Sequence, residues 1–154
     1  MQNSREKRSG LSQQGVSGSI LLWDQNVGQR EGTVHRIGVD IIEIARIDEA
    51  LQRFGSRFMS RIYTGYEATL CQERANRLAA RFAAKEAVMK VLGTGVKGVS
   101  WREIEIQSKA SGEPQICLYG KARAVADSLG LSEFSVSLSH SKDYAVATVI
   151  AATD

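Results

Sequence analysis

Residues 145–152 form an almost wholly apolar segment in which only Thr148 is polar. A run of this length and composition predicts a central β-strand, buried on both faces and paired at both edges. A turn expected at 139–143 joins it to a strand at 134–138, where apolar residues alternate with serines. The chain must therefore fold around a sheet.

A further alternation begins after Val34. Ile37, Val39 and Ile41 occupy every second position, which is the period of a strand with one buried face. Asp40 is then expected on the opposite face of that strand.

Helices are expected between the strands, marked by apolar residues at helical spacing, by a capping box at Thr64–Glu67 and by glycines that end them. The expected helices span 44–54, 64–71, 75–92 and 121–129, and two more strands, 101–107 and 116–118, flank a turn at 111–114. Hairpins at the end and a helical block in the middle predict an α+β domain. Its mostly antiparallel sheet would pack against one long helix and shorter helices.

The composition, 43% hydrophobic and 24% charged, is that of one globular domain. Its two cysteines, Cys71 and Cys117, can build neither a disulfide framework nor a four-ligand zinc site. No apolar run approaches the roughly 20 residues needed to span a bilayer. We expect a cytoplasmic protein without a membrane partner.

Residues 1–33 are rich in Ser, Gln, Gly and Arg and show no sustained period. They predict a flexible N-terminal extension, or an upstream start codon wrongly chosen, and Glu6, Asp24 and Glu31 argue against an organelle transit peptide. The functional domain is expected at 34–154.

Positive charge is concentrated in the middle of the chain, where residues 46–102 hold eleven Lys and Arg against five Asp and Glu. This excess favours a polyanionic small molecule, an acidic protein or nucleic acid as partner, although such side chains can also simply solvate helices.

Phe82, Glu86 and Lys90 lie four residues apart and share one helix face. A surface ion pair between Glu86 and Lys90 is one interpretation. If Asp40 joins them, two carboxylates and a lysine instead suit Mg²⁺, with Lys90 facing a phosphate or acting as a base. Without a His or Cys cluster, zinc is disfavoured.

Two other segments each have two interpretations. The serines, His140 and Lys142 in 137–144 could hold a phosphate through a turn or could serve only local hydrogen bonds. Gly93-Thr94-Gly95 could be a phosphate nest or a helix C-cap.

Taken together, the chain from about Val34 to Thr153 closely resembles the 4'-phosphopantetheinyl transferases of the holo-acyl-carrier-protein synthase type. The resemblance rests on IGVDIIEIARI at 37–47, RFAAKEA at 81–87 with Lys90 and Gly93-Thr94-Gly95, and SLSHS at 137–141 with Tyr144-Ala145.

This resemblance implies Mg²⁺-dependent transfer of 4'-phosphopantetheine from coenzyme A to a serine of apo-acyl-carrier protein, releasing adenosine 3',5'-bisphosphate and supporting fatty acid biosynthesis. It also implies a homotrimer with the site between protomers, where His140 can serve a neighbour's metal.

The resemblance further implies residue roles. Asp40 and Glu86 match the Mg²⁺ ligands, and they form the catalytic set with Lys90, which matches the lysine at the pyrophosphate. The expected contacts to coenzyme A are Arg81, Lys90, Gly93, His140 and Ser141. The exposed Arg46 and Arg53 would bind the acidic carrier protein. The general base stays open between Glu86, directly or through a metal-bound water, and Lys90.

Two other functions fit parts of the pattern. A Mg²⁺-dependent nucleotide phosphohydrolase could use the same carboxylates and lysine. A non-enzymatic nucleic-acid-binding module could use the basic helices, but aromatic residues make up only 6% of the chain, and we expect no nucleic-acid partner.

Overall fold

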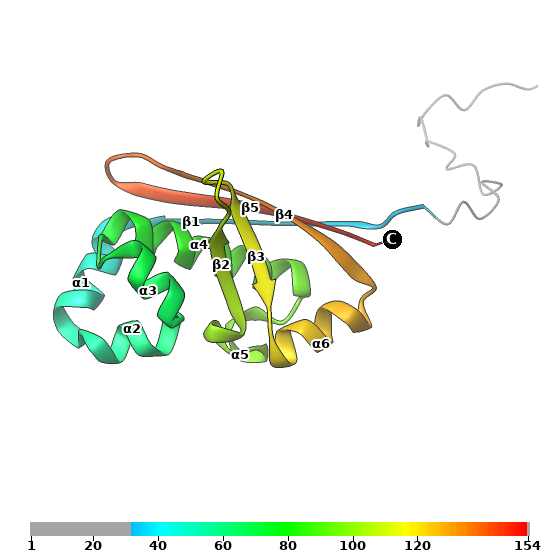
Figure 1. The fold of residues 1–154 in the computed structure, drawn as a ribbon, viewed down its shortest axis with the longest axis horizontal. Helices are drawn as coiled ribbons and strands as arrows, with labels where there is room; N and C mark the ends of the chain where they lie inside the picture. Colours follow the sequence, from blue (N-terminus) through cyan, green and yellow to red (C-terminus); the bar gives the residue numbers. More distant parts are fainter. Residues whose placement is uncertain (1–31, 154) are drawn as a thin grey trace, which may run out of the picture. The chain divides into compact units, whose positions relative to one another are not determined.

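The computed structural model describes residues 32–153, which contain a three-stranded antiparallel sheet. Its strand order is β1 (His35–Glu43), β5 (Tyr144–Thr153), β4 (Leu131–His140), so the apolar C-terminal strand is central, as the sequence predicts (Figure 1). The predicted extension at 1–33 lies almost entirely outside the described residues and stays a prediction.

The helix α4 (Ala75–Leu92) packs against one face of this sheet and is buried along most of its length. Alternate residues of β5 on that face are small and fully buried. On β1 the contact is closer still, because a Cβ atom added at Gly38 would overlap the backbone carbonyl of Ala87. Glycine at this position therefore lets strand and helix main chains touch.

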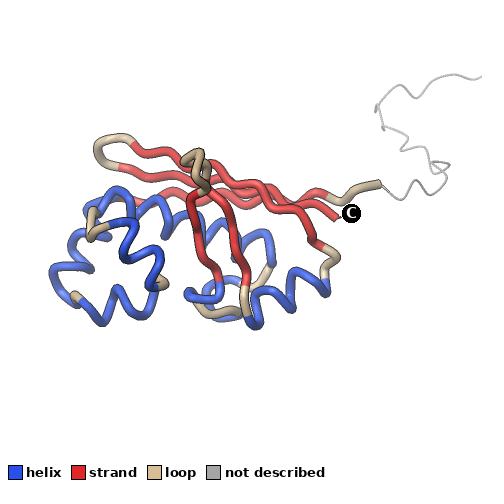
Figure 2. The backbone as a smooth tube through the Cα atoms, viewed as in Figure 1, coloured by secondary structure: helices blue, strands red, loops and turns tan. Residues whose placement is uncertain are grey.

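The remaining elements lie on the same side of the sheet as α4 (Figures 1 and 2). They are α1 (Ile44–Phe54), α2 (Ser56–Ile62), α3 (Gly65–Cys71), α5 (Gly95–Gly98), the 3₁₀ helix η1 (Trp101–Glu103), the hairpin of β2 (Ile104–Ser108) and β3 (Pro114–Leu118), and α6 (Gly120–Ser128). Within residues 32–153, no helix has both the length and the apolar character required to cross a membrane.

The predicted helices at 44–54, 64–71, 75–92 and 121–129 are confirmed to within one residue at their ends. The capping box is present, with both of its hydrogen bonds. The strand expected from Trp101 begins only at Ile104, because the three preceding residues form η1. The helices α2 and α5 were not predicted, since seven and four residues are too few to establish a helical period.

The buried face of β1 was predicted wrongly. Ile37, Val39 and Ile41 are 67%, 49% and 64% exposed, whereas Gly38 and Ile42 are buried on the face toward α4. Alternation identifies which residues share a face, but the close approach at Gly38 decides which face meets the helix. Asp40 lies opposite the apolar face, as expected, and thus points toward α4.

Candidate active site

Asp40 of β1 and Glu86 of α4 meet where strand and helix are closest. Burial raises the pKa of Glu86 above its usual value, and the neighbouring Asp40 carboxylate raises it further by repulsion and hydrogen bonding. Lys90 and Arg46 oppose this shift. The fold therefore holds two carboxylates together despite their repulsion.

Lys90 binds the strand rather than its helical neighbour. Its Nζ donates to the Val39 carbonyl at 2.6 Å and forms an ion pair with Asp40 Oδ1 at 2.9 Å. The ion pairs of the described residues do not include Glu86 with Lys90. The surface pair expected from their spacing is thus replaced by a bridge from α4 to β1.

The carboxylate pair offers a hard cation a partial coordination shell. Among residues 32–153 no group of three or more His, Cys, Asp or Glu side chains could hold a metal. A cation between Asp40 and Glu86 would therefore take its other ligands from water or from a substrate, which is how Mg²⁺ is usually bound at phosphate sites.

His140 and Ser141 lie away from this pair. His140 Nε2 lies 3.4 Å from the side-chain nitrogen Nδ2 of Asn76, which is in the first turn of α4. Ten residues separate Asn76 from Glu86, or about 15 Å along the helix. Ser141 Oγ accepts hydrogen bonds from the backbone amides of Asp143 and Tyr144 and so shapes the β4–β5 turn.

Arg81 lines a surface pocket of about 430 Å³ beside the β2–β3 turn. It is 8% exposed, and its Nε has no hydrogen-bond partner. Its other nitrogens make long bonds of 3.4 Å to the Arg77 carbonyl and to Ser108 Oγ. A buried guanidinium with unused donor capacity is suited to an anionic ligand.

Gly93 ends α4 as a C-cap. Its φ of 71° is left-handed, and its amide donates to the Lys90 carbonyl. The geometry matches the C-cap interpretation, whereas contact with coenzyme A stays a prediction.

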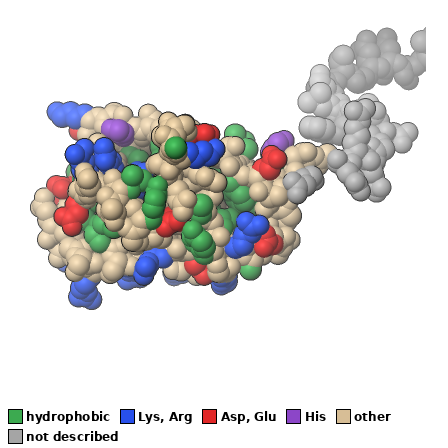
Figure 3. Space-filling view, viewed as in Figure 1, with side chains coloured by type: hydrophobic (Ala, Val, Ile, Leu, Met, Phe, Trp, Pro, Cys, Tyr) green, Lys and Arg blue, Asp and Glu red, His purple; other side chains and the backbone are tan. Residues whose placement is uncertain are grey.

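Arg46 and Arg53 are exposed on α1, as the helical spacing predicts. Arg46 also acts on the carboxylates, because its charge lowers the pKa of Glu86. In Figure 3, both basic and acidic side chains occur over the end of the molecule formed by α1, α2, α3 and the β4–β5 turn.

Sequence reasoning missed a buried ion pair behind the site. Lys85 and Glu67 are both completely buried, with Nζ to Oε2 at 2.7 Å. Lys85 also donates to the carbonyls of Ile62, Trp101 and Ile104. Burial lowers the pKa of Lys85, and Glu67 opposes that shift. The only sequence signal was the capping box, which marked Glu67 as a helix cap.

Comparison with known families gives one consistent result. The model of the 4'-phosphopantetheinyl transferase superfamily matches residues 36–149. A holo-[acyl-carrier-protein] synthase of Gloeobacter violaceus is 51% identical over 120 residues, covering 75% of this chain and 91% of the relative. One from Koribacter versatilis is 50% identical over 117 residues, covering 73% and 94%.

Solved structures agree. The holo-[acyl-carrier-protein] synthase of Helicobacter pylori, in complex with coenzyme A, is 34% identical with a TM-score of 0.69 and covers 75% of this chain and 98% of its own. A holo-(acyl-carrier-protein) synthase from Bacillus anthracis in complex with CoA (3',5'-ADP) is 33% identical with a TM-score of 0.65, covering 80% and 100%.

Proposed function

Because this chain belongs to the 4'-phosphopantetheinyl transferase superfamily, we propose that it transfers 4'-phosphopantetheine from coenzyme A to a serine of an acyl carrier protein. The observation that carries the proposal is the pair Asp40–Glu86 with Lys90 beside it, in a chain about 50% identical to holo-[acyl-carrier-protein] synthases.

Asp40 and Glu86 would hold Mg²⁺. The fit rests on the donor set, since both groups supply carboxylate oxygens and the fold keeps them together against repulsion. When bound, Mg²⁺ neutralises charge on the pyrophosphate and helps to align the reacting groups. Lys90 contributes a further positive charge, because only two of its three protons are used on β1.

The reaction exchanges one phosphorus–oxygen bond for another. The carrier serine Oγ bonds to the phosphorus that bears pantetheine, and the bond from this phosphorus to the bridging oxygen breaks. Adenosine 3',5'-bisphosphate leaves with that oxygen. Glu86 accepts the serine proton directly or through a water, and Lys90 offsets charge that develops on the leaving phosphate.

Arg81 would bind the nucleotide of coenzyme A in the 430 Å³ pocket that its side chain lines. His140 and Ser141 would act from a neighbouring copy, because within one chain they lie far along α4 from Glu86. As the family resemblance implies, the protein would be a homotrimer with shared sites.

The exposed face of the three-stranded sheet supports this assembly. Ile37, Val39, Ile41 and Ile150 are all at least 43% exposed there, and Figure 1 shows that no described element covers this face. A contiguous apolar face of this kind is typical of an interface between copies.

Ile37→Glu is expected to convert the trimer to monomers and to lower transfer activity roughly a hundredfold, because a charge on this face opposes its burial. Light scattering after gel filtration gives the mass. The matched control is Val96→Glu, since Val96 is 51% exposed in α5. A wild-type protein that is active as a monomer would rule out the shared site.

A direct assay tests the function. Purified protein is mixed with coenzyme A, Mg²⁺ and an apo-acyl-carrier protein, and mass spectrometry follows the gain of one phosphopantetheine group by the carrier. Each component is omitted in turn. Coenzyme A cleavage without the carrier would instead indicate a phosphohydrolase.

Arg46→Glu is expected to raise the KM for carrier protein roughly tenfold or more, because it reverses a charge on the face that an acidic partner would meet. The Kd for coenzyme A should stay within about twofold, and added salt should narrow the difference from wild type. Arg123→Glu on α6 is the matched control. Unchanged carrier kinetics in Arg46→Glu would refute the docking role of this face.

A further inference from the structure

The outer edge of β2 is held by two side chains of α3. Glu67 Oε1 accepts from the Ile106 amide at 2.9 Å, and the Tyr66 hydroxyl accepts from the Ser108 amide at 3.1 Å. Amides two residues apart in a strand point to the same edge, and the opposite edge of β2 pairs with β3. Through Tyr66, the contacts between α3 and β2 reach Ser108, the last residue of β2.

Tyr66 binds Ser108 twice. Besides accepting from the amide, its hydroxyl donates to the Ser108 carbonyl at 3.3 Å. Tyr66 is 41% exposed, so its ring is only partly packed in the core. The contact of its hydroxyl with Ser108 is therefore the main interaction that Tyr66→Phe would remove. Its position on α3 is fixed, because the next residue is the capping-box and ion-pair glutamate Glu67.

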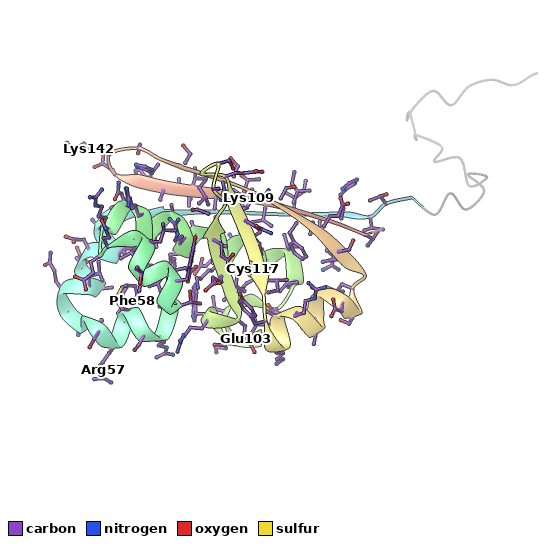
Figure 4. The ribbon with its side chains drawn as sticks, in the orientation of Figure 1. Arg57, Phe58, Glu103, Lys109, Cys117 and Lys142 are labelled. Carbon is purple, nitrogen blue, oxygen red and sulfur yellow. The ribbon has the colours of Figure 1, made fainter. Side chains whose placement is uncertain are left out.

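Ser108 in turn adjoins Arg81. Its Oγ accepts from Arg81 Nη2 at 3.4 Å, and after Ser108 the chain enters the turn that forms one wall of the Arg81 pocket. Within this turn the Lys109 amide bonds to the Glu113 carbonyl and their side chains form an ion pair. Figure 4 labels Lys109 at this end of the hairpin and Glu103 at the other.

We propose that Tyr66 is a positioning residue for coenzyme A, which holds Ser108 so that Arg81 and the β2–β3 turn are set for the nucleotide. The inference rests on the proposed function, since it assigns the Arg81 pocket to that substrate. Tyr66 touches neither the carboxylate pair nor Lys90 in any described contact, so its effect should be on substrate binding and not on the chemical step.

Tyr66→Phe in the full chain is expected to raise the KM and the calorimetric Kd for coenzyme A about five- to tenfold, with kcat within about twofold of wild type, as for the loss of one or two neutral hydrogen bonds. In an Arg81→Ala background the same change should alter Kd less than about twofold, because residues that act through one contact are not additive.

Tyr119→Phe is the matched control. Tyr119 directly follows β3, and its hydroxyl bonds to Glu105 of β2 but does not line the pocket, so a general loosening of the small sheet would affect both variants alike. The inference is wrong if Tyr66→Phe leaves the Kd for coenzyme A unchanged or lowers kcat instead. It is also wrong if Tyr119→Phe raises that Kd as much as Tyr66→Phe does. If the wild-type protein binds no coenzyme A, the proposed function is overturned as well. If the wild-type protein transfers phosphopantetheine normally and Tyr66→Phe has the same Kd for coenzyme A, only the inference is overturned.

Discussion

Glu86→Gln is expected to lower kcat/KM roughly a thousandfold while the fold persists. Glutamine preserves size and can still hydrogen bond to Asp40, but it removes the negative charge that would hold Mg²⁺ and the base that would accept the serine proton. The measurement is the initial rate of carrier modification, and Glu133→Gln on the exposed surface of β4 is the matched control.

A measurement of thermal stability shows whether Glu86→Gln loses activity because it unfolds or because the carboxylate is gone. The pKa of Glu86 is raised in the folded protein, so the folded state binds more protons than the unfolded state between the two pKa values, and stability falls as pH rises through that window. The uncharged amide of the Glu86→Gln side chain removes the free-energy cost of an ionised carboxylate at this position in the folded protein. In metal-free buffer at neutral pH, Glu86→Gln should therefore melt no lower than wild type. A variant that keeps more than about a tenth of wild-type activity would exclude an essential role for the carboxylate.

Lys85→Met is expected to destabilise the protein by about 3–5 kcal/mol. The change leaves Glu67 buried without its cation and removes the donor to three backbone carbonyls, which is far more costly than loss of a surface ion pair. Urea unfolding monitored by circular dichroism gives the free energy of unfolding.

Two variants complete the test of Lys85. Lys97→Met, at an exposed position of α5, should change stability by less than about 0.5 kcal/mol. Adding Glu67→Gln to Lys85→Met should recover part of the loss, because the uncompensated charge is gone. A loss below about 1 kcal/mol in Lys85→Met would contradict the expectation that the variant leaves an uncompensated charge buried at Glu67.

Most element boundaries could be predicted because local chemistry determines them. Gly55 and Gly93 end helices through positive φ values of 49° and 71°, and the Thr64 capping box starts α3. The family resemblance identified Asp40 and Glu86, and the fold places them side by side.

Contacts between distant segments could not be predicted from periodicity. Lys90 satisfies the helical spacing to Glu86, yet it binds Asp40 because the close packing at Gly38 brings β1 within reach. In the sequence Lys85 resembles an ordinary surface lysine. The fold buries it among the backbone carbonyls of Ile62, Trp101 and Ile104. Exposure of the apolar face of β1 likewise depends on which face the helix meets.

The contact at Gly38 also determines the spacing of the candidate site. Gly38 lies two residues before Asp40, and Ala87 directly follows Glu86, so main-chain atoms set the span between the two carboxylates. The nearest side chain at this point is that of Val91, whose Cγ2 lies 3.1 Å from the position of a Cβ atom at Gly38. A larger residue at position 38 would push the strand away from the helix and move the two carboxylates apart, so the spacing of the candidate site depends on this one glycine.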